Sequence, residues 1–449
     1  MSSENESKEI EAAVQLGYSV EFEDDDHRMM AGHHLPLWRD WDGGQLGGRP
    51  TWLNPKDIPQ NHLTCECCKN PLVFVCQLYC PCEDEISPNA FHRSFYVFAC
   101  PKSSNSNLCG KKTTGTIRVL RTQLPQDNPY FPQEQDECWA MHIPESWEVN
   151  LCKVCGQRGH GKCPIQGDHF CGRHHQKEHK KHVFDKKNEP SDEIEHPFMP
   201  SVLTASELVV EEEPLDVKDE KSEEKAGRSM FKSDDLGDDD DEDEEYDRNL
   251  EQGDLNEMTG AGPETVTKDA VTMKFYDRIN SIPNVNTQCL RYLRWPDQEL
   301  CFKTASPLWI RSDYRPDDGD IPSCERCGAE RRFEFQLMPQ MLHYLLKNHQ
   351  MERSKEESIN KKDAEAVRVA TNILEQTPPE QVPPDLVTTT EKAVEAARAK
   401  IMEGGGNVPD WGCVSVFTCT GSCGGMEVKE GAELGAYIEE FAWKQPSLD

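Results

Sequence analysis

The sequence lacks the long apolar segments that mark membrane and secreted proteins. Only 36% of the 449 residues are hydrophobic, and no apolar run approaches the ~20 residues that span a bilayer. Residues 1–11 are polar and acidic, without the apolar stretch of a secretory signal. We therefore expect no membrane association and a reducing compartment, where the 20 cysteines are thiols or metal ligands and not disulfides.

Catalytic signatures are missing as well. The chain contains no HExxH, no HxE…CxxC deaminase pattern, no P-loop, no GxGxxG and no GxSxG. A catalytic metal also needs an open coordination position, whereas four-cysteine sites are closed. The sequence thus predicts a binding protein and not an enzyme.

Positive charge is scarce, and it is scarcest in one segment. The net charge is −33, and residues 191–265 hold 27 acidic and 6 basic side chains, a net charge of −21. Such a chain has no electrostatic reason to hold phosphates, so we expect no direct nucleic-acid binding, but it can attract a strongly basic partner. Residues 185–268 are poor in aromatics and are predicted to be a disordered acidic linker. Its run at 238–245 is either a solubilising spacer or a direct contact for that partner.

What the sequence does contain is a duplicated pattern. The copies match at a tryptophan, a CxxC pair, a glutamine and a Phe-x-Cys: Trp52, Cys68, Gln77 and Cys100 in the first, Trp309, Cys327, Gln336 and Cys419 in the second. Short segments rich in β-branched and aromatic residues at 72–75 and 95–98, and an alternating one at 117–121, predict strands. We expect the two halves to pair into one continuous β surface.

Each copy offers four thiols for one metal ion, because a CxxC turn supplies two ligands and a later pair completes a tetrahedron. The predicted ligands are Cys65, Cys68, Cys100 and Cys109 in the first copy and Cys324, Cys327, Cys419 and Cys423 in the second. The bland alternative is a set of buried free cysteines. The surplus thiols of the first copy, Cys67, Cys76, Cys80 and Cys82, are predicted not to bind metal.

A third cluster lies between the copies, at residues 150–184. Cys152, Cys155, Cys171 and His175 make a complete four-ligand set. A second ion there could use Cys163 with histidines such as His179 and His182, although the alternative is a solvated His/Lys tail. Zn²⁺ is the metal that suits these donors, and we expect three or four ions per chain.

The predicted fold class is α+β, mainly β, with two similar zinc-stabilised β halves. The expected order is a leader (1–47), the first zinc-binding repeat (48–133), a small zinc finger (150–184), the acidic linker (185–268) and the second repeat (270–445). Alanine and apolar spacing predicts two helices in an insertion at 348–408 within the second repeat.

These residues resemble the programmed cell death protein 2 family. The resemblance rests on the segments 47–53, 65–72, 77–79, 91–93, 118–125, 321–339, 411–419 and 439–445, and it covers nearly all of the predicted folded chain. The segment 150–184 is similar to the MYND-type finger of that family. The departure is Gln166, which stands where the family has a cysteine, so the second ion of the finger would need histidine ligands.

The resemblance implies a dedicated, non-enzymatic chaperone of the cytoplasm and nucleus. Its client would be a newly made basic protein of the small ribosomal subunit, delivered during 40S ribosome biogenesis. MYND fingers elsewhere bind proline-rich peptides, which adds a further class of partner. The alternative is a nuclear zinc-finger regulator of transcription, proliferation or apoptosis that acts through protein contacts or DNA.

Overall fold

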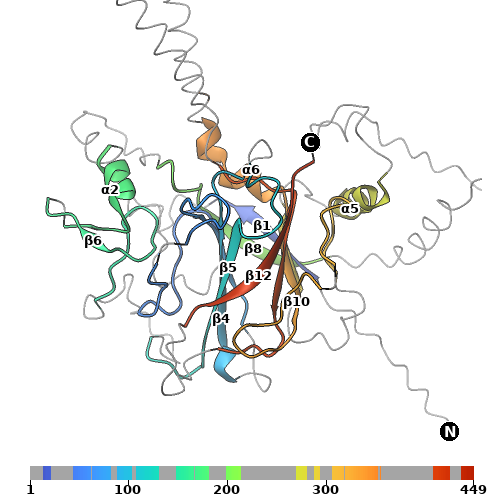
Figure 1. Ribbon diagram of the computed structural model, residues 1–449, viewed down its shortest axis with the longest axis horizontal. Coiled ribbons are helices and arrows are strands. Elements are labelled where there is room, and N and C mark those ends of the chain that lie inside the picture. The colour runs from blue at the N-terminus through green and yellow to red at the C-terminus, as the bar shows by residue number, and fades with distance from the viewer. Residues whose placement is uncertain are drawn as a thin grey trace, which may run out of the picture.

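The chain folds around one closed β-barrel (Figure 1). The computed structural model describes residues 14–21, 44–61, 63–81, 88–103, 108–130, 148–165, 167–181, 199–213, 269–280, 288–293, 306–317, 319–351, 354, 408–424 and 436–448. The predicted insertion helices, Cys82 and His182 lie outside these residues. The described part is mainly β, as predicted.

Ten antiparallel strands form the barrel. Around the ring they are β1 (Val14–Val20), β8 (Ser206–Glu212), β2 (Gln45–Leu46), β3 (Val73–Tyr79), β4 (His92–Ala99), β5 (Ile117–Leu124), β12 (Ile438–Gln445), β11 (Cys413–Cys419), β10 (Arg331–Leu337) and β9 (Gln288–Leu293). The strands predicted at 72–75, 95–98 and 117–121 are confirmed as β3, β4 and β5.

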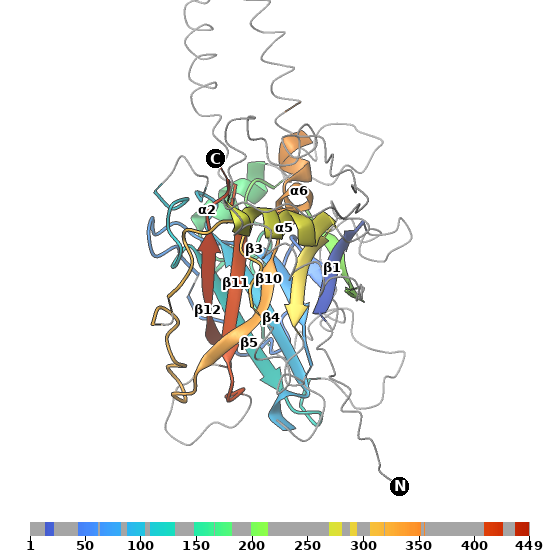
Figure 2. The same ribbon diagram turned by 90° about the vertical axis from the view of Figure 1, so that its right-hand side faces the viewer.

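The two copies of the repeat supply the two sides of this barrel. The first copy gives β3–β5 and the second gives β9–β12, whereas β2 comes from residues predicted to belong to the leader. β5 pairs directly with β12 through Arg121↔Ile438 and Val119↔Glu440. The expectation that the halves pair into one continuous β surface is therefore confirmed. The two strands pair over residues 119–121 and 438–440, and Figure 2 shows β10, β11 and β12 of the second copy in front of β4 and β5 of the first.

The prediction of disorder across 185–268 is wrong for one segment. Residues 206–212 form β8, which pairs with β1 on one side and with β2 on the other. Residues 14–20, predicted to belong to a leader, form β1 and close the barrel between β8 and β9. Local composition hid both strands, because their stability comes from pairing with partners far away in sequence.

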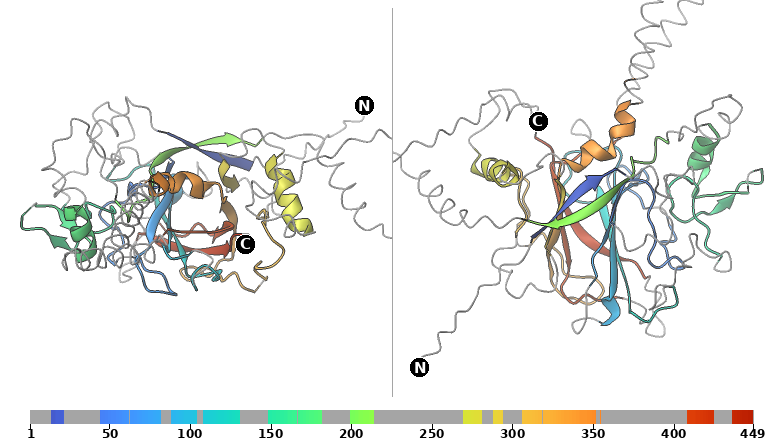
Figure 3. Two further views of the ribbon diagram at one scale, coloured as in Figure 1. Left: turned by 90° about the horizontal axis from the view of Figure 1, so that it is seen from above. Right: turned by 180° about the vertical axis from the view of Figure 1, so that it is seen from behind.

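The short helices lie outside the barrel wall. These are η2 (Pro88–Ala90), α2 (Arg173–His179), α5 (Ala270–Asn280) and α6 (Met341–Leu345). Seen from above, α6 lies over one end of the barrel (Figure 3), and its Met341 and Leu345 pack into the barrel core with Phe95 and Phe335. No helix in the described ranges is long and apolar enough to cross a bilayer.

A buried ion pair between Arg93 and Glu334 joins the two halves of the barrel. Arg93 of β4 donates from both terminal nitrogens to the carboxylate of Glu334 of β10, at 2.5 and 2.8 Å, and both side chains are fully buried. Tyr292 and Thr418 donate their hydroxyls to the same carboxylate. The register of β10 shifts between Phe333 and Phe335, so Glu334 occupies a β-bulge.

The first copy repeats this bulge with a different residue. Its register shifts between Phe74 and Cys76, which places Val75 at the position that Glu334 takes in the second copy. The repeated glutamines are also equivalent in structure. Gln77 accepts the backbone N–H of Thr51, and Gln336 accepts that of Leu308, just before the repeated tryptophans.

Candidate metal centres

Three cysteine-rich clusters in the described part of the chain could each hold a metal ion. The groups are Cys65, Cys68, Cys100 and Cys109; Cys152, Cys155, Cys171 and His175; and Cys324, Cys327, Cys419 and Cys423. We name them the first, finger and third clusters, in chain order. In each cluster the four ligand atoms lie within 4.8 Å of one another. The structure thus brings together each four-ligand set that the sequence predicts.

The same turn presents the leading cysteines of all three clusters. In the first cluster the Cys65 N–H donates to the Asn70 carbonyl at 2.9 Å, and the Lys69 N–H donates to the Cys65 carbonyl at 2.9 Å. The equivalent bonds recur at Cys152 and at Cys324. The fifth residue of two of these turns is Gly156 or Gly328, both with positive φ. These bonds fix both sulfurs of a CxxC pair on one side of a shared point.

The distances within the clusters fit a tetrahedron of sulfur around one ion. Cys68 Sγ lies 3.5 Å from Cys100 Sγ, and Cys65 Sγ lies 3.9 Å from Cys109 Sγ. In the third cluster, the Sγ distances are 3.5 Å for Cys324–Cys423 and 3.4 Å for Cys327–Cys419. A metal–sulfur bond of ~2.3 Å implies a tetrahedral edge of about 3.8 Å. No disulfide joins any of these described cysteines.

The finger cluster replaces one sulfur by an imidazole. His175 on α2 places Nδ1 3.0 Å from Cys171 Sγ and 3.5 Å from Cys152 Sγ, and Cys155 Sγ lies 3.8 Å from Cys171 Sγ. The short hairpin of β6 (Gly161–Lys162) and β7 (His169–Phe170) carries Cys171 to the start of the helix.

One thiol in each all-cysteine cluster ionises readily. Burial alone would raise the pKa of Cys68, but hydrogen bonds from Asn70 and the neighbouring thiols lower it to about 6. Hydrogen bonding to Cys423 lowers the pKa of Cys419 to about 4, against the effect of burial. Burial raises the pKa of Cys100 to about 12. The thiolate is the form that binds metal. In the first and third clusters, therefore, one of the four thiols is already stabilised in the charged form that a metal ion requires.

The finger is docked against the first copy of the repeat. Trp52 donates its indole N–H to the Gly156 carbonyl at 2.7 Å, inside the Cys152–Gln157 turn. Arg158 donates to the carbonyls of Lys56 and Ile58. A Cβ on Gly156 would lie 2.9 Å from Arg49 Cβ. The repeated tryptophan of the first copy therefore serves as the docking contact of the finger.

The described ligands predicted for a second ion in the finger do not form a cluster of this kind. Cys163 and His179 belong to no group of three or more ligands among the described residues. Cys163 nevertheless starts a turn with the same hydrogen bonds, to Asp168 and from Gly167, at 2.8 Å each. His179 is buried, and its Nδ1 has no hydrogen-bond partner in the described part of the chain.

Of the surplus thiols of the first copy, Cys76 and Cys80 pack in the barrel core, and Cys67 borders the first cluster. The described groups that hold the cysteine loops in place were not predicted. They include Arg121, Glu440 and Lys444, all buried on strands that pair across the two halves. The sequence offered little sign of them, because both strands mix charged and apolar residues and burial of a charged side chain is uncommon.

The comparisons with known proteins agree with this architecture. Residues 13–138 match the N-terminal domain of programmed cell death protein 2, and residues 269–373 match its C-terminal domain. The bovine protein named programmed cell death protein 2 is 27% identical over 434 residues, which cover 92% of this chain and 94% of the relative. The rat protein of the same name is 27% identical over 426 residues, which cover 91% and 93%.

A second group of relatives matches only part of the chain. The human protein named programmed cell death protein 2-like is 34% identical over 109 residues, or 24% of this chain and 27% of that protein. No solved structure matches. Both domain matches, and the long alignments that join them, show that the chain belongs to the programmed cell death protein 2 family.

Proposed function

We propose that the three clusters hold structural zinc. The observation that carries this proposal is the closed set of four soft or imidazole donors in each cluster, at separations close to the edge of a zinc–sulfur tetrahedron. Zinc bound there would cross-link segments far apart in sequence and contribute on the order of 10 kcal/mol or more to folding.

A fourth ion in the finger belongs to the same proposal. Its ligands would be Cys163 and His179, with His182 or another histidine of the finger. Two observations support it. Cys163 begins a turn with the same hydrogen bonds as the leading cysteines of the three clusters, and the Nδ1 of His179 is buried without a hydrogen-bond partner in the described part of the chain. Elemental analysis of the purified protein should give three or four zinc ions per chain, and two or fewer would contradict the assignment.

We propose further that the chain acts without catalysis, as an escort for a newly made basic protein of the small ribosomal subunit. The charge of −33 supports a basic client, because opposite charge speeds encounter and shields the client from RNA. The family resemblance supports the ribosomal assignment. The escort would work in the cytoplasm and the nucleus during 40S assembly.

The test is capture of partners by the full-length, zinc-loaded protein. A cytosolic lysate should yield one basic small-subunit protein, held with an affinity that falls as salt rises. Deleting residues 234–247 decides the role of the acidic run, since an unchanged affinity and salt slope would make it a spacer. Recovery of chromatin factors alone would contradict the escort proposal.

A nuclear regulator is the second candidate function. The names of the relatives refer to programmed cell death, and finger domains also bind proline-rich peptides. The docking of Gly156 and Arg158 on the barrel leaves the finger less surface for such contacts. Binding of a proline-rich peptide or of duplex DNA at physiological salt would favour this candidate.

A further inference from the structure

Two buried basic side chains occupy equivalent positions in the two copies of the repeat. Arg121 on β5 lies opposite Phe95, and Lys444 on β12 lies opposite Val414. Phe95 and Val414 each precede the third cysteine of their own cluster by five positions. Both basic residues are almost completely buried, at 0% and 1% exposure.

Lys444 belongs to the second copy, but its head group lies at the first cluster. Its ammonium donates to the carbonyl of Cys109 at 3.1 Å and to that of Gly110 at 2.7 Å. Its backbone N–H donates to the Thr113 carbonyl at 2.7 Å. Lys444 thus holds the loop that carries the fourth ligand of the first cluster.

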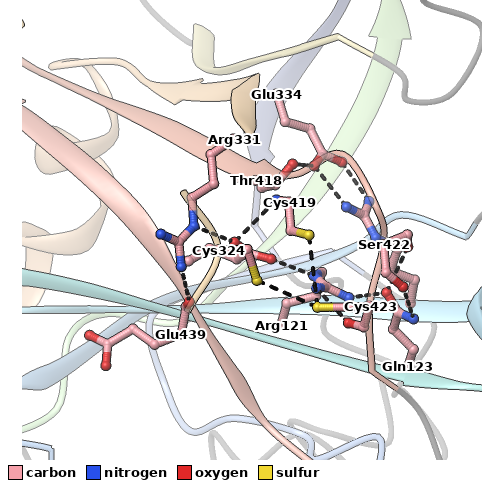
Figure 4. A network of polar contacts seen from close by, with 12 residues as sticks. Arg121, Gln123, Cys324, Arg331, Glu334, Thr418, Cys419, Ser422, Cys423 and Glu439 are labelled. Carbon is pink, nitrogen blue, oxygen red and sulfur yellow. Dashed lines mark hydrogen bonds and ion pairs between the residues drawn. The ribbon is translucent and has the colours of Figure 1, made fainter. Parts of the chain in front are cut away.

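Arg121 makes the reverse contact. It belongs to the first copy, and its Nη2 donates to the carbonyl of Cys423, the fourth ligand of the third cluster, at 2.8 Å (Figure 4). Gln123, two residues along β5, donates to the carbonyl of Ser422 and accepts the Ser422 hydroxyl. The loop that ends the third cluster is therefore held from β5, as the loop of the first cluster is held from β12.

The third cluster has one more link across the junction between β5 and β12, which we call the β5–β12 seam. Glu440 on β12 accepts the Nε–H of Arg121 at 2.7 Å, the Nε–H of Arg331 at 3.1 Å and the backbone N–H of Cys419 at 3.2 Å. Figure 4 shows Arg121 and Arg331 close to the sulfurs of Cys324, Cys419 and Cys423. Arg121 thus contacts the third cluster directly at Cys423 and indirectly at Cys419.

An ion held by four thiolates needs this kind of support. Two metal charges against four thiolate charges leave a net charge of about −2, and burying such charge is costly unless opposite charge lies nearby. Groups around a metal site that orient its ligands are worth about 10- to 100-fold in metal affinity. Lys444 supplies a positive charge and an orienting contact at the first cluster. At the third cluster Arg121 supplies the orienting contact, and Arg121 and Arg331 together outweigh the single carboxylate of Glu440.

We propose that each half of the barrel completes the metal site of the other half, through Lys444 at the Cys109 loop and Arg121 at the Cys423 loop. This inference rests on metal binding by the two clusters, which is part of the proposed function. Since both residues lie on the strands that form the β5–β12 seam, a metal site becomes tight only when the two halves have joined.

The test uses thiol alkylation of the zinc-loaded, full-length protein, with each cysteine followed by mass spectrometry. Lys444→Met should increase the alkylation rate of the cysteines of the first cluster about 10- to 100-fold. The cysteines of the third cluster should react more slowly than those of the first. Arg121→Met should have the opposite effect, so that the cysteines of the third cluster are alkylated faster than those of the first. In each variant the substitution and the weakened site lie in opposite halves.

Two control variants separate this effect from general loosening. Glu439→Gln weakens the ion pair with Arg118 at the same seam, and in the described part of the chain the Glu439 carboxylate makes no hydrogen bond to either cysteine loop, so alkylation should not change. Lys444→Arg keeps the charge and should restore most of the protection. Circular dichroism of each variant shows whether the barrel remains folded.

The outcomes distinguish this inference from the metal assignment. If a chelator leaves the alkylation of wild-type cysteines unchanged, the clusters hold no metal and the proposed function fails. A second set of outcomes overturns the cross-half inference alone. In these, a chelator exposes the wild-type cysteines, but Lys444→Met increases alkylation of both clusters equally, of the third cluster before the first, or of neither.

Discussion

Replacing Arg93 by methionine should destabilise the barrel by about 3–5 kcal/mol, because it leaves the carboxylate of Glu334 buried and uncompensated. Arg93 and Glu334 are both fully buried, and the remaining donors to Glu334 are the neutral hydroxyls of Tyr292 and Thr418. Since 1.4 kcal/mol is a factor of ten, the folding equilibrium should fall by roughly 100- to several-thousand-fold. Urea unfolding of the zinc-loaded protein, followed by fluorescence of the buried Trp52 and Trp411, measures the loss.

The matched control combines Arg93→Met with Glu334→Val. Valine is the residue that the first copy places at the same bulge, as Val75, so the backbone there accepts it. Replacing a whole buried pair by apolar residues is often neutral or stabilising, and the double variant should recover most of the loss. The summed cost of the single changes should exceed that of the double variant by at least about 3 kcal/mol. A single-variant loss below about 1 kcal/mol, or additive costs, would refute the reasoning.

Three further predictions concern the docked finger, the metal and pH. Trp52→Phe removes the indole N–H donated to Gly156 and should cost about 1–3 kcal/mol, seen as faster proteolysis of residues 150–181. Chelation of zinc should expose all the thiols of the three clusters to alkylation and lower the melting temperature, whereas an unchanged melt would count against structural zinc. Burial tends to raise the pKa of Glu213, but Arg291 and Arg278 hold it below 4.5. Its contribution to stability should be present above pH 4.5 and lost as pH falls through the lower folded value, and Glu213→Gln should flatten the pH profile of stability there.

The cysteine-rich clusters could be predicted from the sequence because their signal is local. A CxxC turn has a fixed spacing, and the duplication located its distant partners at Cys100 and Cys419. The strands β3, β4 and β5 were equally accessible, since each is a short β-branched or aromatic run between turn residues.

The closure of the barrel could not be predicted, because it depends on pairing over long distances. β8 carries a net negative charge in an acidic segment, and only its partners β1 and β2 make it a strand. The roles of Lys444 and Arg121 were hidden for a related reason. Each acts on a loop of the other copy, and no spacing within one copy reports that contact.

The β5–β12 seam has a consequence for synthesis of the chain on the ribosome. Arg121 and Glu440, which meet across it, are 319 residues apart. At ~5–20 residues per second, translation needs roughly 16–64 s to supply the second partner after the first has been made. During that interval β5 offers an unpaired strand edge, a surface prone to association with other chains. Among the described strands β12 is the last to be translated, so the ring cannot close before residues 438–445 have been made, and until then the nascent chain has to be kept from such association.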